Sequence, residues 1–324
     1  MGYPRARIVD SSTSGFYHCI SRCVRRAFLC GDEYDHRRLW IEQRLAELLD
    51  VFTIEACAYA IMSNHLHLIL KTDPKAAREL TDLEVARRWI QLFPAQLQRR
   101  KQAAGSPAEA RRVETAYLQS IVADRRKIAR WRARLASISW FNKMLKEPIA
   151  RRANREDHCT GHFWEGRFKS IRLLDRAAVL ACMVYVDLNP MRAGMAKALH
   201  ECSFASILNR LKVLRRPDQR RRRRPRRTRR ARITLTLIPI NTLFSFSTSE
   251  YVSLVGATGG VPTDKRDHRC TLTEMGIDAE AWADTIGRTI EWFGTAVGRT
   301  GDLLKEARRR KARRVVSAID IYLE

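Results

Sequence analysis

The order of apolar and polar residues at the start of the chain predicts one helix among three strands. Phe16 to Val24 combines aromatic, β-branched and cysteine residues with partial alternation, which is typical of a strand. Asp32 to Asp50 carries four leucines and a tryptophan at helical spacing. Phe52 to Ala60 and His65 to Lys71 are apolar runs joined by a short turn, and we expect a strand in each. This order predicts an α+β fold in which helices cover one face of a small sheet.

The middle of the chain alternates between charged helical patterns and apolar segments. Asp82 to Arg100 and Pro107 to Ala136 have helical patterns with many charges, and they fit a basic accessory lobe or a solvated helical insertion equally well. Ser139 to Asn154 predicts a further helix. Phe163 to Leu174 mixes aromatic, apolar and cationic residues, as a strand that also contacts a ligand does.

A long apolar helix is predicted next. Asp175 can accept the first hydrogen bonds of a helix that runs from Arg176 to Leu188. Pro190 has no backbone N–H and restricts the residue before it, so we expect the helix to end near Leu188.

An arginine-rich run separates this part from the end of the chain. Arg215 to Arg232 contains twelve arginines and two prolines, cannot bury a core and predicts a linker. Ile233 to Phe246 is apolar and β-prone, whereas Glu274 to Glu324 has a helical pattern with a basic last helix around Arg308 to Arg314. The predicted division is a first domain over residues 1–210 with a helical insertion at 75–137, a linker at 211–239, and a smaller, mainly helical C-terminal extension at 240–324.

The net charge indicates a polyanionic partner. The 324 residues include 61 Lys and Arg against 35 Asp and Glu, a net charge of +26. Residues 215–232 hold twelve arginines and one aspartate, hence +11, which leaves +15 on the other residues. Nucleic acid fits better than anionic lipid, because no amphipathic membrane helix is evident. No apolar stretch has the length of a membrane span and no signal core follows the N-terminus, so we expect a cytoplasmic, nucleoid-associated protein of bacterial type.

Two histidines with one residue between them are the first candidates for chemistry. In a strand, His65 and His67 share one face and Leu66 takes the other. Neutral imidazoles side by side suit a divalent metal ion. The alternative is a pair of solvated histidines on an edge strand. Another cluster of histidine and cysteine, at residues 158–162, lacks a second ligand pair at a matching spacing.

Tyr185 and Asn189 are four residues apart and therefore lie on one face of the predicted apolar helix. A phenol is a weak nucleophile at neutral pH, since its ordinary pKa is about 10, but it can attack a phosphodiester that a bound cation polarises. The Asn189 amide oxygen and the two imidazoles would give three ligands for Mg²⁺ or the more nitrogen-tolerant Mn²⁺. Such a site would cleave a strand by transesterification, leaving a phosphotyrosine. Spacing alone also allows Tyr185 to be a core aromatic residue with its hydroxyl satisfied and Asn189 to be a helix-end residue.

Three segments together resemble the HUH single-tyrosine transposases, and most closely the branch of REP-associated tyrosine transposases. They are Asn64 to Leu70 (Asn-His-Leu-His-Leu-Ile-Leu), Gly161 to Ser170 (Gly-His-Phe-Trp-Glu-Gly-Arg-Phe-Lys-Ser) and Tyr185 to Gly194 (Tyr-Val-Asp-Leu-Asn-Pro-Met-Arg-Ala-Gly). The resemblance lies in their order and spacing and covers about residues 12–200. Residues 251–298 resemble the C-terminal extension of longer members more loosely.

The resemblance implies a fold, a metal site and a nucleophile. The family's fold is a ferredoxin-like antiparallel sheet. Its paired histidines bind the metal, at the places of His65 and His67, and its nucleophile sits on a helix, at the place of Tyr185. The better-known branch has a glutamine ligand four residues after the tyrosine, where this chain has the shorter Asn189. The family acts on single-stranded DNA, often with a hairpin beside the cut, and its branches act with one subunit or two, so a monomer or a homodimer is expected.

Several residues combine positive charge with stacking surfaces, as grooves for single-stranded DNA do. The candidates for DNA binding are Arg22, Trp164, Arg167, Phe168, Lys169 and Arg192. Core packing explains the two aromatic residues equally well. His18 is a possible neighbour of the site, although a hydrogen-bonded sheet histidine fits it better.

These features support two hypotheses about function. The first is a metal-dependent endonuclease and strand transferase for single-stranded DNA, which acts through a 5′-phosphotyrosine in DNA transposition. The second is a non-catalytic protein that binds hairpin DNA or RNA on the same fold.

Overall fold

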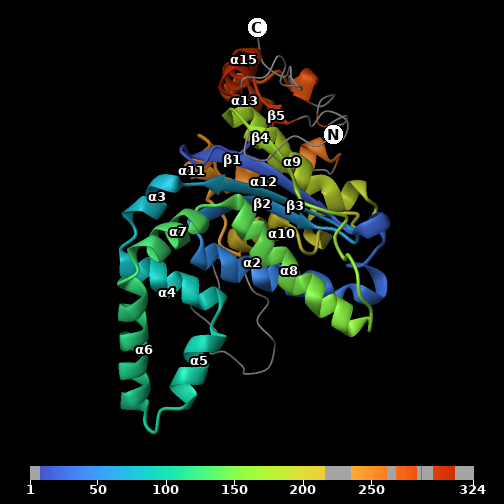
Figure 1. Ribbon diagram of the computed structural model, residues 1–324. Coiled ribbons are helices and arrows are strands. Elements are labelled where there is room, and N and C mark those ends of the chain that lie inside the picture. The colour runs from blue at the N-terminus through green and yellow to red at the C-terminus, as the bar shows by residue number, and fades with distance from the viewer. Residues whose placement is uncertain (1–7, 216–234, 261–267, 283–285, 287–294, 311–324) are drawn as a thin grey trace.

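The computed structural model describes residues 8–215, 235–260, 268–282, 286 and 295–310 (Figure 1). Five strands form one sheet in the order β2-β3-β1-β4-β5. They are β1 (Gly15–Arg22), β2 (Ile54–Ile61), β3 (His65–Thr72), β4 (Lys169–Leu173) and β5 (Ala296–Val297). Neighbours among β1 to β4 are antiparallel, and β5 pairs with β4 in parallel. The α+β class is confirmed, and the first four strands have the order of a ferredoxin-like sheet.

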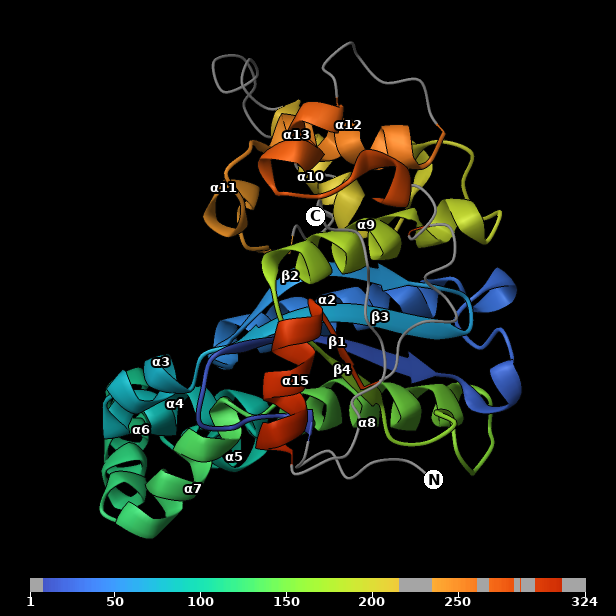
Figure 2. The same cartoon turned by 90° about the horizontal axis from the view of Figure 1, so that it is seen from above.

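Helices cover both faces of the sheet, so the prediction of helices on one face is wrong. The first face carries α2 (His36–Val51) and α8 (Ile138–Glu156), and the second carries α9 (Arg176–Arg192) (Figure 2). The reason lies in β3, whose residues 66 to 70 are all buried although alternate side chains point to opposite faces. Leu66 and Leu68 join the core with α2 and α8, whereas Ile69 joins the core with α9. A strand that is apolar on both faces needs a cover on both.

One side of α9 is fixed to the C-terminal helices α10 (Ser206–Leu214) and α12 (Thr248–Thr258). Residues 177 to 190 of α9 are all buried. The Asp187 carboxylate accepts hydrogen bonds from the Ser206 hydroxyl, from the Ile207 N–H at 2.9 Å and from the Tyr251 hydroxyl at 2.7 Å. This arrangement leaves the opposite side of α9 facing the sheet.

The last turn of α9 continues through Pro190 to Arg192, so the predicted end near Leu188 is wrong. Proline removes one backbone donor, but the turn still forms because the N–H of Ala193 donates to the Asn189 carbonyl at 2.9 Å. Asn189 therefore lies inside the helix, one turn after Tyr185.

The segment between β3 and α8 is helical and projects from one end of the sheet as a lobe (Figures 1 and 2). Its helices are α3 (Pro74–Glu79), α4 (Asp82–Leu92), α5 (Ala95–Gln102), α6 (Pro107–Val122) and α7 (Arg125–Leu135). Thr81 forms a capping box before α4, and Ser106 and Asp124 accept hydrogen bonds from the first turns of α6 and α7. Asp124 divides the predicted stretch 107–136 into α6 and α7, whereas the stretch 82–100 is interrupted at Pro94, the residue before α5.

The described residues beyond 240 are mainly helical. Besides α12 they form α11 (Ile240–Leu243), α13 (His268–Glu274) and α15 (Thr300–Arg309). In the described part of the β-prone run, residues 235–246, the strand-like pairing is limited to an isolated bridge from Leu237 to Ala56, and α11 occupies residues 240–243. Tyr251 and Leu254 share a buried cluster with α9, while the division into domains stays a prediction. The arginine run beyond residue 215 and the chain beyond 310 lie outside the described residues.

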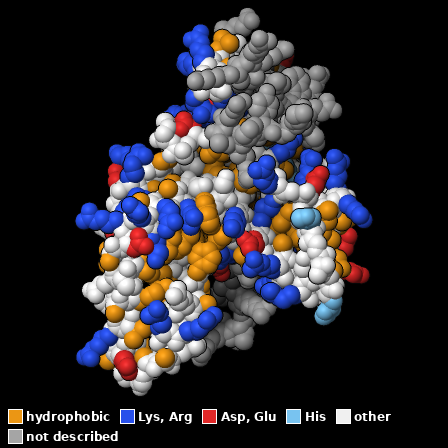
Figure 3. Space-filling view, viewed as in Figure 1, with side chains coloured by type: hydrophobic (Ala, Val, Ile, Leu, Met, Phe, Trp, Pro, Cys, Tyr) orange, Lys and Arg blue, Asp and Glu red, His pale blue; other side chains and the backbone are white. Residues whose placement is uncertain are grey.

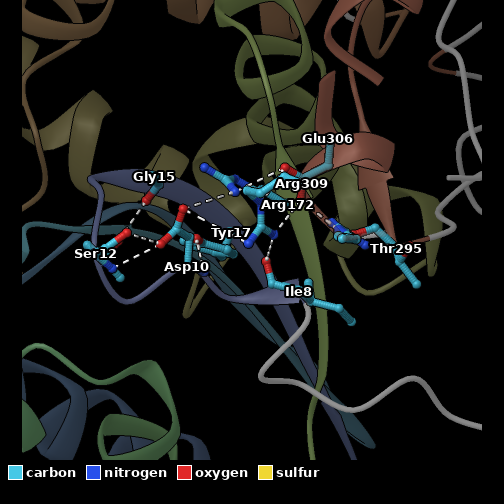
Figure 4. Close-up of polar contacts among 11 residues, drawn as sticks. Ile8, Asp10, Ser12, Gly15, Tyr17, Arg172, Thr295, Glu306 and Arg309 are labelled. Atoms are coloured by element: carbon cyan, nitrogen blue, oxygen red, sulfur yellow. Dashed lines mark hydrogen bonds and ion pairs between the residues drawn. The ribbon is translucent and has the colours of Figure 1, made fainter. Parts of the chain in front are cut away.

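Charged residues join α15 to β4 and to the segment before β1 (Figure 4). The Arg172 guanidinium lies 3.1 Å from the Glu306 carboxylate and 3.8 Å from that of Asp10. Arg309 donates to Glu306 at 2.7 Å and to the carbonyl of Ile8 at 3.3 Å. Because Glu306 is 4% exposed, these ion pairs are little screened by salt and hold α15 against the sheet edge.

Short 3₁₀ helices also occur, at Val24–Arg26, Asp32–Tyr34 and Leu199–Glu201. The second of these occupies the start of the helix predicted from Asp32, so α2 itself begins at His36. None of the described helices is both long and apolar enough to cross a membrane.

Candidate active site

The histidine pair lies on the face of β3 that α9 covers. His65 pairs with Arg22 of β1, and His67 pairs with Ile20 of β1 and Ala60 of β2. The two imidazole centroids are 4.8 Å apart. Since β3 is an internal strand and His67 is 3% exposed, the alternative of solvated histidines on an edge strand is wrong.

His18 of β1 fixes the orientation of the His67 ring. The Nε2 atom of His18 lies 2.8 Å from Nδ1 of His67, and the two rings are stacked with centroids 5.0 Å apart. Within the described residues, the buried Nε2 of His67 has no hydrogen-bond partner. A ring held at Nδ1 with Nε2 unsatisfied is the usual geometry of a metal-binding histidine with its supporting contact. The prediction that His18 is a hydrogen-bonded sheet histidine is correct. Its hydrogen-bond partner, His67, is one of the candidate metal ligands, so His18 also lies beside the site.

Tyr185 reaches this cluster from the middle of α9. Its ring centroid lies 5.7 Å from that of His67 and 6.3 Å from that of His18. The side chain is 6% exposed. Burial raises the pKa of the Tyr185 phenol, while a hydrogen bond with Asn189 and the charges of Arg192 and Arg22 oppose the rise. The Arg192 guanidinium lies 5.4 Å from the centroid of the Tyr185 ring, and its Nη1 donates to the Ile286 carbonyl at 2.8 Å.

Asn189 connects the tyrosine to the histidines. Its Nδ2 donates to the backbone carbonyl of Tyr185 at 3.1 Å, and the side chain is 9% exposed. The side chain also forms hydrogen bonds with the Tyr185 hydroxyl and the His65 ring. The amide oxygen accepts from the His65 ring, because this hydrogen bond raises the His65 pKa, whereas the second N–H of the amide donates to the Tyr185 hydroxyl oxygen, because that hydrogen bond lowers the Tyr185 pKa.

All three imidazoles are neutral at neutral pH. Burial, then the charge of Arg22, lowers the pKa of His65 to about 4, against a smaller rise from the Asn189 hydrogen bond. Burial, then the neighbouring His65, lowers the pKa of His18 to about 3. Burial and the neighbouring His18, His65 and Arg22 lower the pKa of His67 well below its ordinary value. Neutral imidazole is the form that binds metal.

The donor set fits a divalent cation. It offers neutral imidazoles at His65 and His67, an unsatisfied buried nitrogen, and the amide oxygen of Asn189 one turn from Tyr185. The described residues contain no cluster of three His, Cys, Asp or Glu that could hold a metal, and this also applies to the group at 158–162. The three-ligand set therefore depends on Asn189.

The six predicted DNA-binding residues separate into two places. Arg22 and Lys169 lie on the site face, at the ends of β1 and β4, and Arg192 ends α9 beside Tyr185. Trp164, Arg167 and Phe168 instead line a groove of about 620 Å³ along α8, on the opposite face of the sheet. The pairing of the strands assigns Lys169 to the site face, because it pairs with Ile20, which pairs with His67.

No family model and no curated protein matches the chain. A solved structure described as a REP-associated tyrosine transposase bound to a REP hairpin superposes with a TM-score of 0.38 and 11% sequence identity. The superposition covers 65% of this chain and 86% of that one, and the chain is similar to it only at that level.

Proposed function

We propose that this protein is a metal-dependent endonuclease and strand transferase for single-stranded DNA, with Tyr185 as the nucleophile and a 5′-phosphotyrosine as the intermediate. The observation that carries the proposal is the position of the Tyr185 ring, 5.7 Å from His67, whose buried Nε2 has no hydrogen-bond partner among the described residues. The resemblance of the three sequence motifs to single-tyrosine transposases supports the same assignment and suggests a target with a hairpin beside the cut.

His65, His67 and Asn189 would hold Mg²⁺ or Mn²⁺. Two nitrogen ligands favour Mn²⁺ over Mg²⁺ in affinity. When bound, the cation would neutralise phosphate charge and polarise the scissile phosphorus. His18 would keep the His67 ring in the tautomer and orientation that direct Nε2 away from β1.

The proposed reaction exchanges one phosphodiester for another. The Tyr185 oxygen forms a bond to phosphorus, and the bond from phosphorus to the 3′-oxygen breaks. The phenolic proton ends on that 3′-oxygen, so the products are a 5′-phosphotyrosine and a free 3′-hydroxyl. Since no water enters the balance, a second 3′-hydroxyl can reverse the step on another strand. Arg192 and Arg22 would stabilise the developing phenolate, because their charges lower the Tyr185 pKa.

A labelling experiment tests the nucleophile. Hairpin-bearing single strands with randomised flanks, labelled at the 3′ end, are incubated with the protein and Mn²⁺ and separated on a denaturing gel. The proposal predicts a protein band that carries the 3′ label, because the 5′-phosphate of the downstream fragment becomes attached. A 5′ label should appear only on the free cleaved strand.

The matched variants are Tyr185→Phe and Tyr117→Phe. Tyr117 lies on α6 in the lobe, where its hydroxyl donates to Gln96 at 2.7 Å, far from the histidines. The labelled band should vanish in Tyr185→Phe and persist in Tyr117→Phe. Equal adduct formation by both variants would exclude Tyr185 as the nucleophile.

The second candidate function is hairpin binding without cleavage. The observation in its favour is the 6% exposure of Tyr185, which leaves little of the phenol in contact with solvent. It predicts salt-dependent binding of hairpin DNA or RNA with no covalent band under any divalent metal. Competition between DNA and RNA hairpins of one sequence would then identify the ligand.

A further inference from the structure

Aromatic and cationic side chains follow one another along α7 and α8. The α7–α8 strip consists of Lys127, Trp131, Arg134, Trp140, Lys143 and Arg167. The Lys127 ammonium lies 5.9 Å from the Trp131 ring centroid, and the Lys143 ammonium lies 4.9 Å from that of Trp140. The Arg134 guanidinium lies 4.1 Å from the Trp140 ring centroid. Trp131 and Trp140 are half-buried, so each indole is partly in solvent.

The strip leads into the groove along α8. Trp140 and Lys143 line the groove on the α8 side, and Arg167 lines it from the loop before β4. Phe163 and Trp164 line the same groove as buried rings with centroids 4.9 Å apart. The groove therefore combines aromatic rings with cations at its margin.

The charge on this face is neutralised only in part: Lys127 lies 3.7 Å from the Asp124 carboxylate and Arg132 pairs with Asp82. α7 carries six cationic residues and no acidic one over residues 125–135. Lys143 and Arg167 form no ion pair with an acidic residue in the described part of the chain, and the one acidic residue of the groove, Glu147, pairs with Arg151. Figure 3 shows this face, with hydrophobic side chains flanked by Lys and Arg side chains.

Packing explains only part of this arrangement. Trp89 and Trp164 are 5% and 8% exposed, and burial of apolar area accounts for them. Trp131 and Trp140 are half-buried and so bury a smaller fraction of their area than Trp89 and Trp164. Cationic side chains lie beside their rings, which solvent still reaches. Base stacking on exposed rings beside cations that neutralise phosphates is how proteins hold single strands without reading sequence.

We propose that the α7–α8 strip is a second binding surface, for single-stranded DNA that is not being cut. It lies on the α8 side of the sheet, whereas Tyr185 and the histidines lie on the α9 side (Figure 2). A strand held on the strip is therefore separated from the nucleophile by the sheet. The strip would retain flanking or displaced DNA while another segment occupies the site.

The test measures binding without chemistry. Fluorescence anisotropy follows a labelled single strand of about 16 nucleotides, with the Tyr185→Phe protein in EDTA. The result does not depend on whether Tyr185 is a nucleophile, so this proposal and the proposed function can fail separately.

Two sets of variants locate the surface. The double variant Lys143→Ala/Arg167→Ala should make the plot of log affinity against log salt concentration shallower by about 1.4, since each phosphate contact contributes about 0.7 to the steepness for single strands. The control pair Arg111→Ala/Arg112→Ala removes the same charge from exposed positions on α6 and should leave the slope unchanged. Equal slopes for both pairs would overturn the location.

Stacking is tested at Trp140. Trp140→Leu should weaken binding about tenfold, whereas Trp140→Phe, which keeps a ring, should retain most of the affinity. Circular dichroism confirms that both variants are folded. A loss equal in both variants, or duplex DNA binding as tightly as the single strand, would overturn the stacking assignment.

Discussion

Replacement of His18 by leucine removes the side chain that supports the candidate metal site but leaves the candidate ligands themselves unchanged. His18 is fully buried, and its Nε2 lies 2.8 Å from Nδ1 of His67. Leucine fills a similar volume but leaves that nitrogen of His67 buried without a partner. An unpaired buried polar group costs about 1–3 kcal/mol, and we expect the free energy of unfolding to fall by this amount.

The same change should weaken metal binding. Loss of the contact that orients a histidine ligand lowers metal affinity by about 10–100-fold. Isothermal titration calorimetry with Mn²⁺ measures the affinity, and urea denaturation measures the unfolding free energy. Neither readout requires DNA or activity.

Ile171→Val is the matched control for stability. Ile171 lies opposite His18 on β4, on the same face of the sheet, and is 1% exposed. This change should cost about 0.5–1.5 kcal/mol of stability and leave Mn²⁺ affinity unchanged. The reasoning is refuted if His18→Leu destabilises the protein but binds Mn²⁺ as tightly as wild type, or if both variants lose metal affinity equally.

Three further predictions concern pH and the buried polar contacts. The pKa of His65 is about 4 and that of His67 is also lowered, so both imidazoles stay neutral below the ordinary pKa of 6.5. The affinity for Mn²⁺ should therefore change little between about pH 7.5 and pH 5.5. A loss of affinity near tenfold over this range, measured by calorimetry, would contradict the assigned ligands. Tyr251→Phe removes the 2.7 Å hydrogen bond to the buried Asp187 carboxylate and should lower the unfolding free energy by about 1.5–3 kcal/mol in urea. Tyr117→Phe removes an exposed hydrogen bond to Gln96 from a half-buried tyrosine and should change it by less than about 0.5 kcal/mol. Burial tends to raise the pKa of Asp10, but hydrogen bonds from Ser12 and Thr13 and the charge of Arg172 outweigh it and bring the pKa to about 2. The ionised Asp10 carboxylate therefore contributes fully to stability above pH 3.8, and this contribution is lost as the pH falls towards 2. Asp10→Asn should show a smaller drop in melting temperature over that pH range than wild type.

Local patterns in the sequence contain much of the fold and of the site. The two-residue period of a strand places His65 and His67 on one face, and the helical spacing of Tyr185 and Asn189 places them on one side of α9. The strand and helix order of the first four strands follows from apolar periodicity. These features depend on residues close together in the chain, so one sequence is enough to predict them.

The features that the sequence does not predict depend on register and on contacts between distant segments. The pairing of β1 with β3 decides that His18 meets His67, 49 residues away. The side of the sheet on which Trp164 lies depends on how the loop before β4 packs against α8. Helix α9 covers the second face of the sheet and is buried on all its sides. An apolar composition allows such burial but does not require it.

The most direct test of the account is to locate the covalent bond. Trypsin cleavage after Arg176 and Arg192 releases residues 177–192, a peptide in which Tyr185 is the single tyrosine. After reaction with hairpin DNA and Mn²⁺, nuclease digestion and mass spectrometry should find a nucleotide joined through its 5′-phosphate to Tyr185. A DNA adduct on any other residue, or cleaved DNA with no adduct on this peptide, would contradict the assignment of Tyr185 as the nucleophile.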